Sequence, residues 1–220
     1  MKVELLAYTP QPEQIVASAA RLCYSADGVT ELMESMDEER VDNFIKKLAD
    51  MGHESPFEHV NFTFGVEGVS RALSHQMVRH RIASYSQKSQ RYVNEKSFTY
   101  IVPPSIASNE EALADYHAQM EAIRKAYTRL SEIIPREDAR YVLPNACETK
   151  FVVTMNVRSL NNFFRLRCCQ RAQWEIRELA KTMLKEVSKV APRIFANSGA
   201  ACEVEGYCPE GEYSCGRINK

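Results

Sequence analysis

Alternating hydrophobic and polar positions predict the strands of this chain. Residues 3–7 alternate near the N-terminus, residues 60–66 give the clearest pattern, and residues 151–155 repeat it. Because successive side chains of a strand point to opposite faces of a sheet, each pattern indicates a strand with one buried face. A fourth strand is predicted over residues 98–102, where two prolines follow and terminate it.

Apolar residues spaced three and four positions apart predict the helices, because this spacing places them on one helical face. The predicted helices cover residues 12–22, 41–51, 113–134 and 176–190. Pro12 opens the first, Gly52 ends the second and Pro192 ends the last. Further helices are expected to start at Ser70 and, with a serine cap, at Ser159.

Strands and helices interleave without an internal repeat or a low-complexity linker. The sequence therefore predicts an α+β fold, as a single domain over residues 1–220, with a β-sheet packed by helices and with long C-terminal helices. The regular stripe of residues 113–134 also suits packing against another subunit.

Seven cysteines, an odd number, occur in a chain that shows neither a secretory signal nor an apolar run long enough to span a bilayer. We therefore expect reduced thiols and a cytoplasmic protein without a membrane partner. Cys202, Cys208 and Cys215 recur at spacings of six and seven residues. Metal-ligating cysteines usually pair more closely, so the sequence favours a loose tail over about residues 200–220 rather than structural zinc, and we predict no metal ligand.

The formal charge of −1 argues against a surface shaped throughout for nucleic acid. Residues 68–94 and 151–174, however, contain arginines and no acid. Within the first window, residues 79–92 read RHRIASYSQKSQRY, a concentration of arginine, tyrosine and hydroxyl donors. This set matches a nucleotide, although a solvated basic loop is the commoner explanation of such a run on its own. The glycines form neither G-x-G-x-x-G nor a Walker loop, which argues against Rossmann and P-loop enzymes.

One motif makes the interpretation specific. The run Arg79-His80-Arg81, followed after seven residues by Ser89, resembles the RHR-x7-S motif of flavin-dependent thymidylate synthases. Further segments resemble that family in the same order: GHESPFEH at 52–59, PREDARYVLP at 135–144, NVRSLNNFFRLR at 156–167 and AQWEI at 172–176.

The resemblance implies an enzyme that methylates dUMP to dTMP at a non-Rossmann FAD site. Methylenetetrahydrofolate would donate the carbon and NADPH the reducing equivalents. The family also implies a homotetramer whose active sites are shared, with Ser89 and Arg167 reaching one dUMP from different chains.

By motif position, the resemblance implies FAD contacts from Ser55, Arg79, His80, Arg81, Gln87, Asn156, Val157, Arg158 and Asn162. It implies dUMP contacts from Gln76, Met77, Val78, Arg79, Gln87, Lys88, Ser89, Gln90, Arg91, Arg140 and Arg167. Gln87 stands where some relatives have an acid, so its contact stays open.

Three residues are candidates for catalysis. Arg167 is expected to stabilise negative charge that builds in the uracil ring. Ser89 either attacks the ring or hydrogen-bonds it, and the absence of a base nearby in sequence favours hydrogen bonding. His53 is expected near the flavin and folate.

Other residues have structural explanations. The spacing of His53, Glu54, Glu58 and His59 is not that of a helical metal-binding pair, and we expect a structural role for His59. Cys168 and Cys169 beside Arg167 invite comparison with a catalytic thiolate, but cysteine is more often a small buried hydrophobe. Trp174 and the tyrosines of residues 113–134 are expected in the core.

Two alternative functions stay open from the sequence. A nucleic-acid-binding module would use the two arginine windows, and salt-dependent binding to random oligonucleotides would support it. An inactive relative would serve as an assembly protein through residues 113–134.

Overall fold

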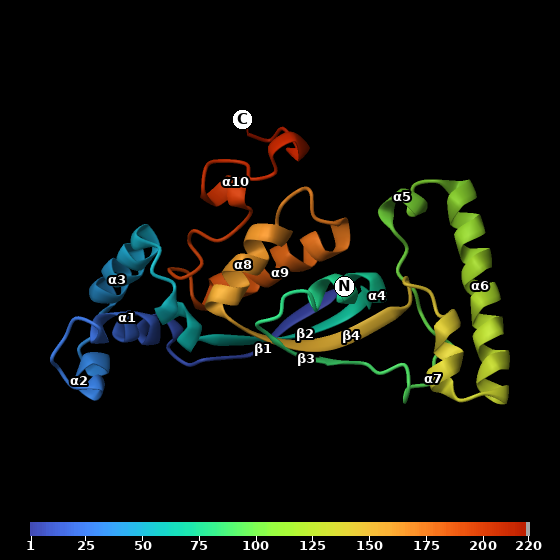
Figure 1. The fold of residues 1–220 in the computed structure, drawn as a ribbon, viewed down its shortest axis with the longest axis horizontal. Coiled ribbons are helices and arrows are strands. Elements are labelled where there is room, and N and C mark those ends of the chain that lie inside the picture. The colour runs from blue at the N-terminus through green and yellow to red at the C-terminus, as the bar shows by residue number, and fades with distance from the viewer. Residues whose placement is uncertain (219–220) are drawn as a thin grey trace. The chain divides into compact units, whose positions relative to one another are not determined.

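The computed structural model describes residues 1–218, and its four strands form one sheet (Figure 1). The strands are β1 (Lys2–Tyr8), β2 (Asn61–Ser70), β3 (Ser84–Gln87) and β4 (Glu148–Asn156). They are ordered β1-β2-β4-β3. The sheet topology and the mixture of strands and helices confirm the predicted α+β class.

The register shows that neighbouring strands are antiparallel. The Thr9 amide donates to the Asn61 carbonyl at 3.0 Å, whereas Leu6 lies against Gly65, so residue numbers run in opposite directions along β1 and β2. The Thr63 and Thr154 hydroxyls meet at 2.9 Å across β2 and β4. An antiparallel sheet differs from the parallel sheet of a Rossmann fold.

The helices follow the predicted order, with several short additions. The α-helices are α1 (Pro12–Leu22), α2 (Val29–Glu34), α3 (Glu38–Met51), α4 (Arg71–Met77), α5 (Pro104–Ala107), α6 (Glu110–Ile133), α7 (Arg136–Ala139), α8 (Val157–Arg167), α9 (Trp174–Val190) and α10 (Ala201–Val204). The 3₁₀ helices are η1 (Ser55–His59), η2 (Arg140–Val142) and η3 (Gly211–Tyr213).

The chain forms two compact units. The first unit contains residues 1–2, 66–79 and 85–152, and the second unit contains residues 3–65, 80–84 and 153–220. Strands β2 and β4 contribute residues to both units. The single domain over residues 1–220 stays a prediction, and residues 219–220 of the predicted tail lie outside the described part.

The core of the first unit is built on α6. Phe98, Met120 and Cys147 are buried together, with Tyr116 packed against them. Tyr116 donates its hydroxyl to the Ile101 carbonyl at 2.8 Å, and Tyr127 of the same helix is fully buried. The predicted core role is therefore confirmed for Tyr127, whereas Tyr116 is partly buried and packs against the core.

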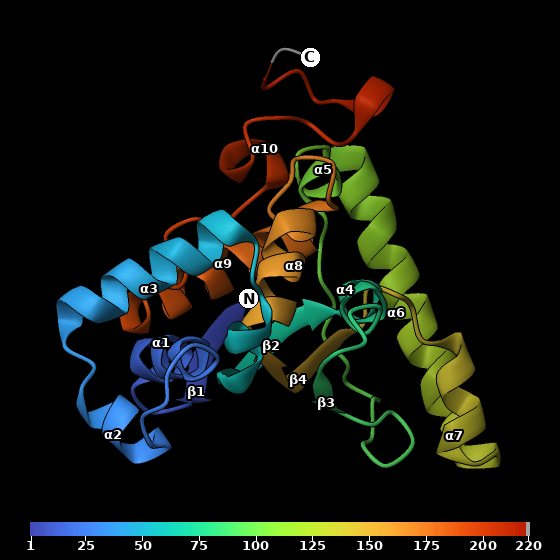
Figure 2. The ribbon, with the colours of Figure 1, turned by 60° about the vertical axis from the view of Figure 1, so that its left-hand side comes forward.

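In the second unit, α8 and α9 lie side by side (Figures 1 and 2). Phe164 of α8 meets Phe195 edge-on at 6.0 Å between ring centroids, and Phe195 meets Phe62 of β2 at 5.5 Å. These rings supply a continuous aromatic core. Trp174, which was predicted in the core, is only partly buried.

Most predicted elements are confirmed, and two predictions are wrong. Residues 98–102 form only an isolated bridge between Tyr100 and Cys147, because their aromatic side chains pack toward α6 and two prolines follow. The cap of α8 is Asn156 rather than Ser159, since the Asn156 amide oxygen accepts from the Ser159 backbone N–H at 2.8 Å.

No helix within residues 1–218 is both long enough and apolar enough to cross a membrane.

Candidate functional site

The RHR motif occupies the turn that follows α4. Ser70 caps α4 by accepting from the Leu73 amide at 3.0 Å, and the helix ends at Met77. The side chains of Arg79 and Arg81 are exposed, and neither makes a hydrogen bond or ion pair within residues 1–218. Two guanidinium groups are thus available to an anionic ligand.

The middle residue of the motif points into the second unit. His80 is only 8% exposed, and its ring meets Phe163 edge-on at 4.9 Å. Arg167, at the end of α8, donates Nε–H to His80 Nε2 at 3.1 Å. Burial, and secondly the positive charge of Arg167, lower the pKa of His80 to about 4. His80 is therefore neutral near pH 7 and serves as an acceptor that orients Arg167.

The start of α8 and η1 form a polar surface in the second unit. Arg158 donates Nε–H to Glu54 at 3.0 Å and also pairs with Glu58. The Ser55 hydroxyl lies 3.1 Å from His53 Nε2. The predicted residues His53, Ser55 and Arg158 thus belong to one neighbourhood, in which Arg158 contacts the carboxylates of Glu54 and Glu58.

Arg91 and Arg140 meet at Glu137 in the first unit. Arg91 donates from Nε at 3.0 Å and from Nη2 at 2.8 Å to the same carboxylate oxygen. Arg140 Nε donates to the Glu137 backbone carbonyl at 3.0 Å. Arg91 and Arg140 are 49 positions apart in the sequence, and both contact Glu137.

Side-chain contacts with Thr149 and Glu95 fix the segment that joins β3 to Arg91. Gln87 donates Nε2–H to the Thr149 hydroxyl at 3.1 Å, which joins β3 to β4 through side chains. Lys88 lies 2.8 Å from the buried Glu95 carboxylate. The Ser89 hydroxyl accepts a hydrogen bond from the Arg91 backbone N–H at 3.3 Å. This bond stabilises the turn that contains Arg91, the residue predicted to bind the phosphate of dUMP.

The remaining predicted residues lie on α4, on α8 or in the segment after β3. Gln76, Met77 and Val78 end α4, Gln90 is buried against Cys147, Val157 is buried in the first turn of α8, and Asn162 is exposed on α8. The predicted residues are divided between the two units: Ser89, Arg91 and Arg140 belong to the first, and His53, His80 and Arg167 to the second.

Cys168 is buried, and burial first, followed by the Glu203 carboxylate, raises its pKa to about 11. A thiol with this pKa is protonated at pH 7 and is a poor nucleophile. The interpretation of Cys168 as a small core residue is confirmed.

Sequence reasoning missed several residues that organise the site. Glu137, Thr149 and Phe163 contact predicted site residues but carry no chemistry that a motif would identify. Glu137 could have been noticed, since it is one of the two acids of the PREDARYVLP segment.

Comparison with known proteins places the chain in a family. The family described as "Thymidylate synthase complementing protein" matches residues 4–193. The flavin-dependent thymidylate synthase of Clostridium tetani is 54% identical over 234 residues, covering 99% of this chain and 94% of the relative. This chain belongs to the flavin-dependent thymidylate synthase family.

Other members of the family also match nearly the whole chain. The flavin-dependent thymidylate synthase of Geobacter sulfurreducens is 53% identical over 220 residues, covering 99% of this chain and 94% of its own length. That of Pyrococcus abyssi is 44% identical over 221 residues, covering 96% and 91%. The resemblance inferred from the RHR-x7-S motif is therefore confirmed along nearly the whole chain.

Proposed function

We propose that the protein is a flavin-dependent thymidylate synthase that methylates dUMP to dTMP, with FAD as cofactor, methylenetetrahydrofolate as carbon donor and NADPH as reductant. The observation that carries the proposal is the exposed Arg79 and Arg81 pair of the RHR motif in a chain that matches family members over nearly its whole length.

The donor chemistry fits FAD. The guanidinium groups of Arg79 and Arg81 suit the diphosphate. Arg158, at the start of α8, would add a third cation once the ligand displaces its ion pairs with Glu54 and Glu58. Ser55, Asn156 and Asn162 supply neutral polar groups for the sugar and ring. The Asn156 side chain caps α8, so its contact with FAD would use the NH₂ group, which the cap leaves available.

Arg91 and Arg140 hold the phosphate of dUMP in this proposal. Both reach Glu137, so their guanidinium groups are already directed to one locality. Gln87 and Ser89, on the segment that precedes Arg91, face the sugar and uracil. Ser89 serves as a hydrogen-bond donor to the ring, because its hydroxyl contacts a backbone amide rather than a base.

Arg167 activates the uracil ring. Carbon-5 becomes nucleophilic only as negative charge builds on the ring, and a fixed guanidinium stabilises that charge as it develops. Neutral His80 accepts from Arg167 and therefore fixes the guanidinium without competing for its charge. Bound flavin supplies the redox chemistry that converts the transferred carbon to a methyl group.

The active enzyme is proposed to be a cytoplasmic homotetramer with shared sites. Ile82, Tyr92 and Tyr141, each beside a predicted binding arginine, are 73%, 74% and 83% exposed in one chain. Large apolar groups this exposed next to binding residues suit burial by a ligand or by another subunit.

The nucleic-acid alternative is less well supported. Arg91, Arg158 and Arg165 are each paired with a carboxylate, so much of the positive charge in the two arginine windows is neutralised within the chain. A surface that follows a phosphate backbone needs unpaired cations along its length.

Turnover by purified protein tests the proposal. Protein loaded with FAD should form dTMP from dUMP, methylenetetrahydrofolate and NADPH, measured by chromatography. Arg167→Ala should still bind FAD, seen by flavin absorbance, but should lose nearly all turnover, because it removes charge stabilisation and leaves the flavin contacts in place. Wild-type turnover by Arg167→Ala would exclude Arg167 as the ring-activating residue.

A further inference from the structure

Four cysteines far apart in the sequence line one small cavity of the second unit. Cys169 follows the end of α8, and Cys202, Cys208 and Cys215 come from the chain after α9. The Cys202 thiol lies within electrostatic range of both Cys169 and Cys208. All seven cysteines of the chain are free thiols, and these four account for every cysteine after Cys168.

The C-terminal segment is folded so that its cysteines return to this cavity. Cys202 lies in α10, and Cys215 follows η3. Gly206 and Gly211 separate the three cysteines and have φ values of 72° and 54°. These are left-handed conformations that glycine adopts at low cost, and one such residue lies between each cysteine and the next.

A backbone N–H and two arginine side chains lie beside these sulfur atoms. The Arg171 backbone N–H donates to Cys169 Sγ at 3.5 Å, and hydrogen bonds to sulfur are characteristic of metal-bound thiolates. Arg165 and Arg171 also line the cavity. The Arg171 guanidinium lies over the Tyr213 ring at 5.3 Å, which fixes η3 against the turn that carries Cys169.

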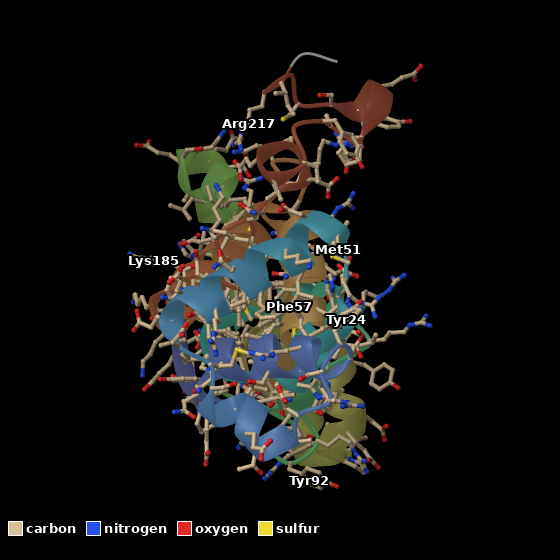
Figure 3. All side chains as sticks on the ribbon, turned by 90° about the vertical axis from the view of Figure 1, so that its left-hand side faces the viewer. Tyr24, Met51, Phe57, Tyr92, Lys185 and Arg217 are labelled. Atoms are coloured by element: carbon tan, nitrogen blue, oxygen red, sulfur yellow. The ribbon has the colours of Figure 1, made fainter. Side chains whose placement is uncertain are left out.

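Ion pairs anchor the segment independently of the thiols. Arg165 of α8 pairs with Glu205, and Arg217 pairs with Glu203 of α10. Figure 3 shows Arg217 close to α10. Ion pairs therefore anchor the turns that carry Cys202, Cys208 and Cys215, and the loose tail over about residues 200–220 stays a prediction.

The cavity has room for about 20 Å³ of occupant, which is the scale of a single water molecule or ion. Among residues 1–218, no three histidine, cysteine, aspartate or glutamate side chains already stand in a metal-binding arrangement. Ligation would therefore require the four thiols to turn into the cavity, chiefly by rotation about the Cα–Cβ bond of each cysteine.

We propose that Cys169, Cys202, Cys208 and Cys215 form a tetrathiolate site for a thiophilic divalent cation of the zinc class. Each thiol would release one proton to solvent and form one metal–sulfur bond, with no change of oxidation state. Four thiolates and one divalent cation leave a net charge of −2, which Arg171 beside the cavity would partly offset. The site would be structural, because four protein ligands leave no open position for chemistry.

Metal analysis of the full-length protein tests this site without reference to catalysis. Protein reduced with a phosphine, exposed to zinc and passed through a desalting column should retain about one zinc per chain, measured by mass spectrometry of the elements. Cys202→Ser and Cys208→Ser should each lower zinc affinity by more than roughly tenfold. Cys23→Ser, which changes an exposed cysteine outside the cavity, should retain zinc like the wild type.

Cobalt provides a second readout that does not depend on the folding of a variant. Wild-type protein with cobalt in place of zinc should show the intense absorption of tetrahedral thiolate coordination, and zinc should displace it. Failure of the reduced wild type to retain either metal would overturn the proposal. So would intact-mass analysis of anaerobically purified protein that showed disulfides among these cysteines, or iron with sulfide bound in place of zinc. Because dTMP formation is not measured, failure here leaves the proposed enzymatic function untouched.

Discussion

At the scale of single residues, the His80–Arg167 pair links the family motif to the proposed ring-activating group. The two residues are 87 positions apart, and no sequence pattern joins them. Arg167 was assigned from its position in the family resemblance and from its charge, whereas the residue that orients it became apparent only from the buried ring of His80. The structure thus gives His80 a positioning role that motif reading had assigned only to flavin contact.

This pair predicts a pH dependence of stability. The pKa of His80 is lowered to about 4 in the folded protein from 6.5 in the unfolded chain. The unfolded chain therefore binds the proton more readily, and the stability contributed by neutral His80 is complete above pH 6.5 and is lost as the pH falls through about 4. His80→Gln keeps an acceptor but does not titrate, so urea unfolding at several pH values should show a smaller loss of stability between pH 6.5 and 4 than in the wild type. If the free energy of unfolding changed equally with pH in the two proteins, His80 would not be a buried neutral histidine.

Glu137 predicts a second residue-level effect. Its carboxylate occupies Arg91, which the proposal assigns to the dUMP phosphate, so substrate must displace an ion pair that is half exposed on both sides. Exposed pairs contribute little, and Glu137→Gln should therefore lower KM for dUMP by about two- to fivefold with little change in kcat. Glu132→Gln removes a comparable surface pair with Lys96 and should leave KM unchanged. An increase in KM for Glu137→Gln alone would mean that Glu137 pre-orients Arg91.

At the scale of elements, the spacing of apolar residues predicted those strands and helices that bury one face in the core. Strands β1, β2 and β4 and helices α1, α3, α6 and α9 were predicted because their apolar residues repeat every second, or every third and fourth, position. Strand β3 was missed because its sequence, SYSQ, contains no aliphatic side chain, and it is held by hydrogen bonds to β4 instead. Residues 98–102 were predicted as a strand from their apolar side chains, but these side chains pack in the core built on α6 and not in a sheet.

The cap of α8 gives a prediction at this scale. Asn156→Ala leaves the Ser159 amide without its acceptor and should lower the free energy of unfolding by about 1 kcal/mol. Asn156→Ser retains a capping oxygen and should recover most of that loss in the same urea titration. Both variants lose the amide group offered to FAD, so both should bind FAD more weakly. If only the alanine variant bound FAD more weakly, the helix cap and not the amide group would support the cofactor.

At the scale of the whole molecule, the family resemblance implies that Ser89 and Arg167 reach one dUMP from different chains. Ser89→Ala and Arg167→Ala oligomers should each be nearly inactive. Co-refolding equal amounts should restore activity, because random two-fold pairing leaves roughly a quarter of the sites with both native residues. If the mixture stays as inactive as its parents despite verified subunit exchange, both residues act from one chain.

The transfer of a single carbon from folate to dUMP is the central claim. The most direct measurement uses methylenetetrahydrofolate labelled with carbon-13 in its one-carbon unit, together with dUMP, NADPH and the FAD-loaded protein, and identifies the nucleotide product by mass spectrometry. The proposal predicts dTMP that carries the label and that is absent when FAD has been removed. Folded, FAD-loaded protein that yields no dTMP, or dTMP without the label, would contradict it.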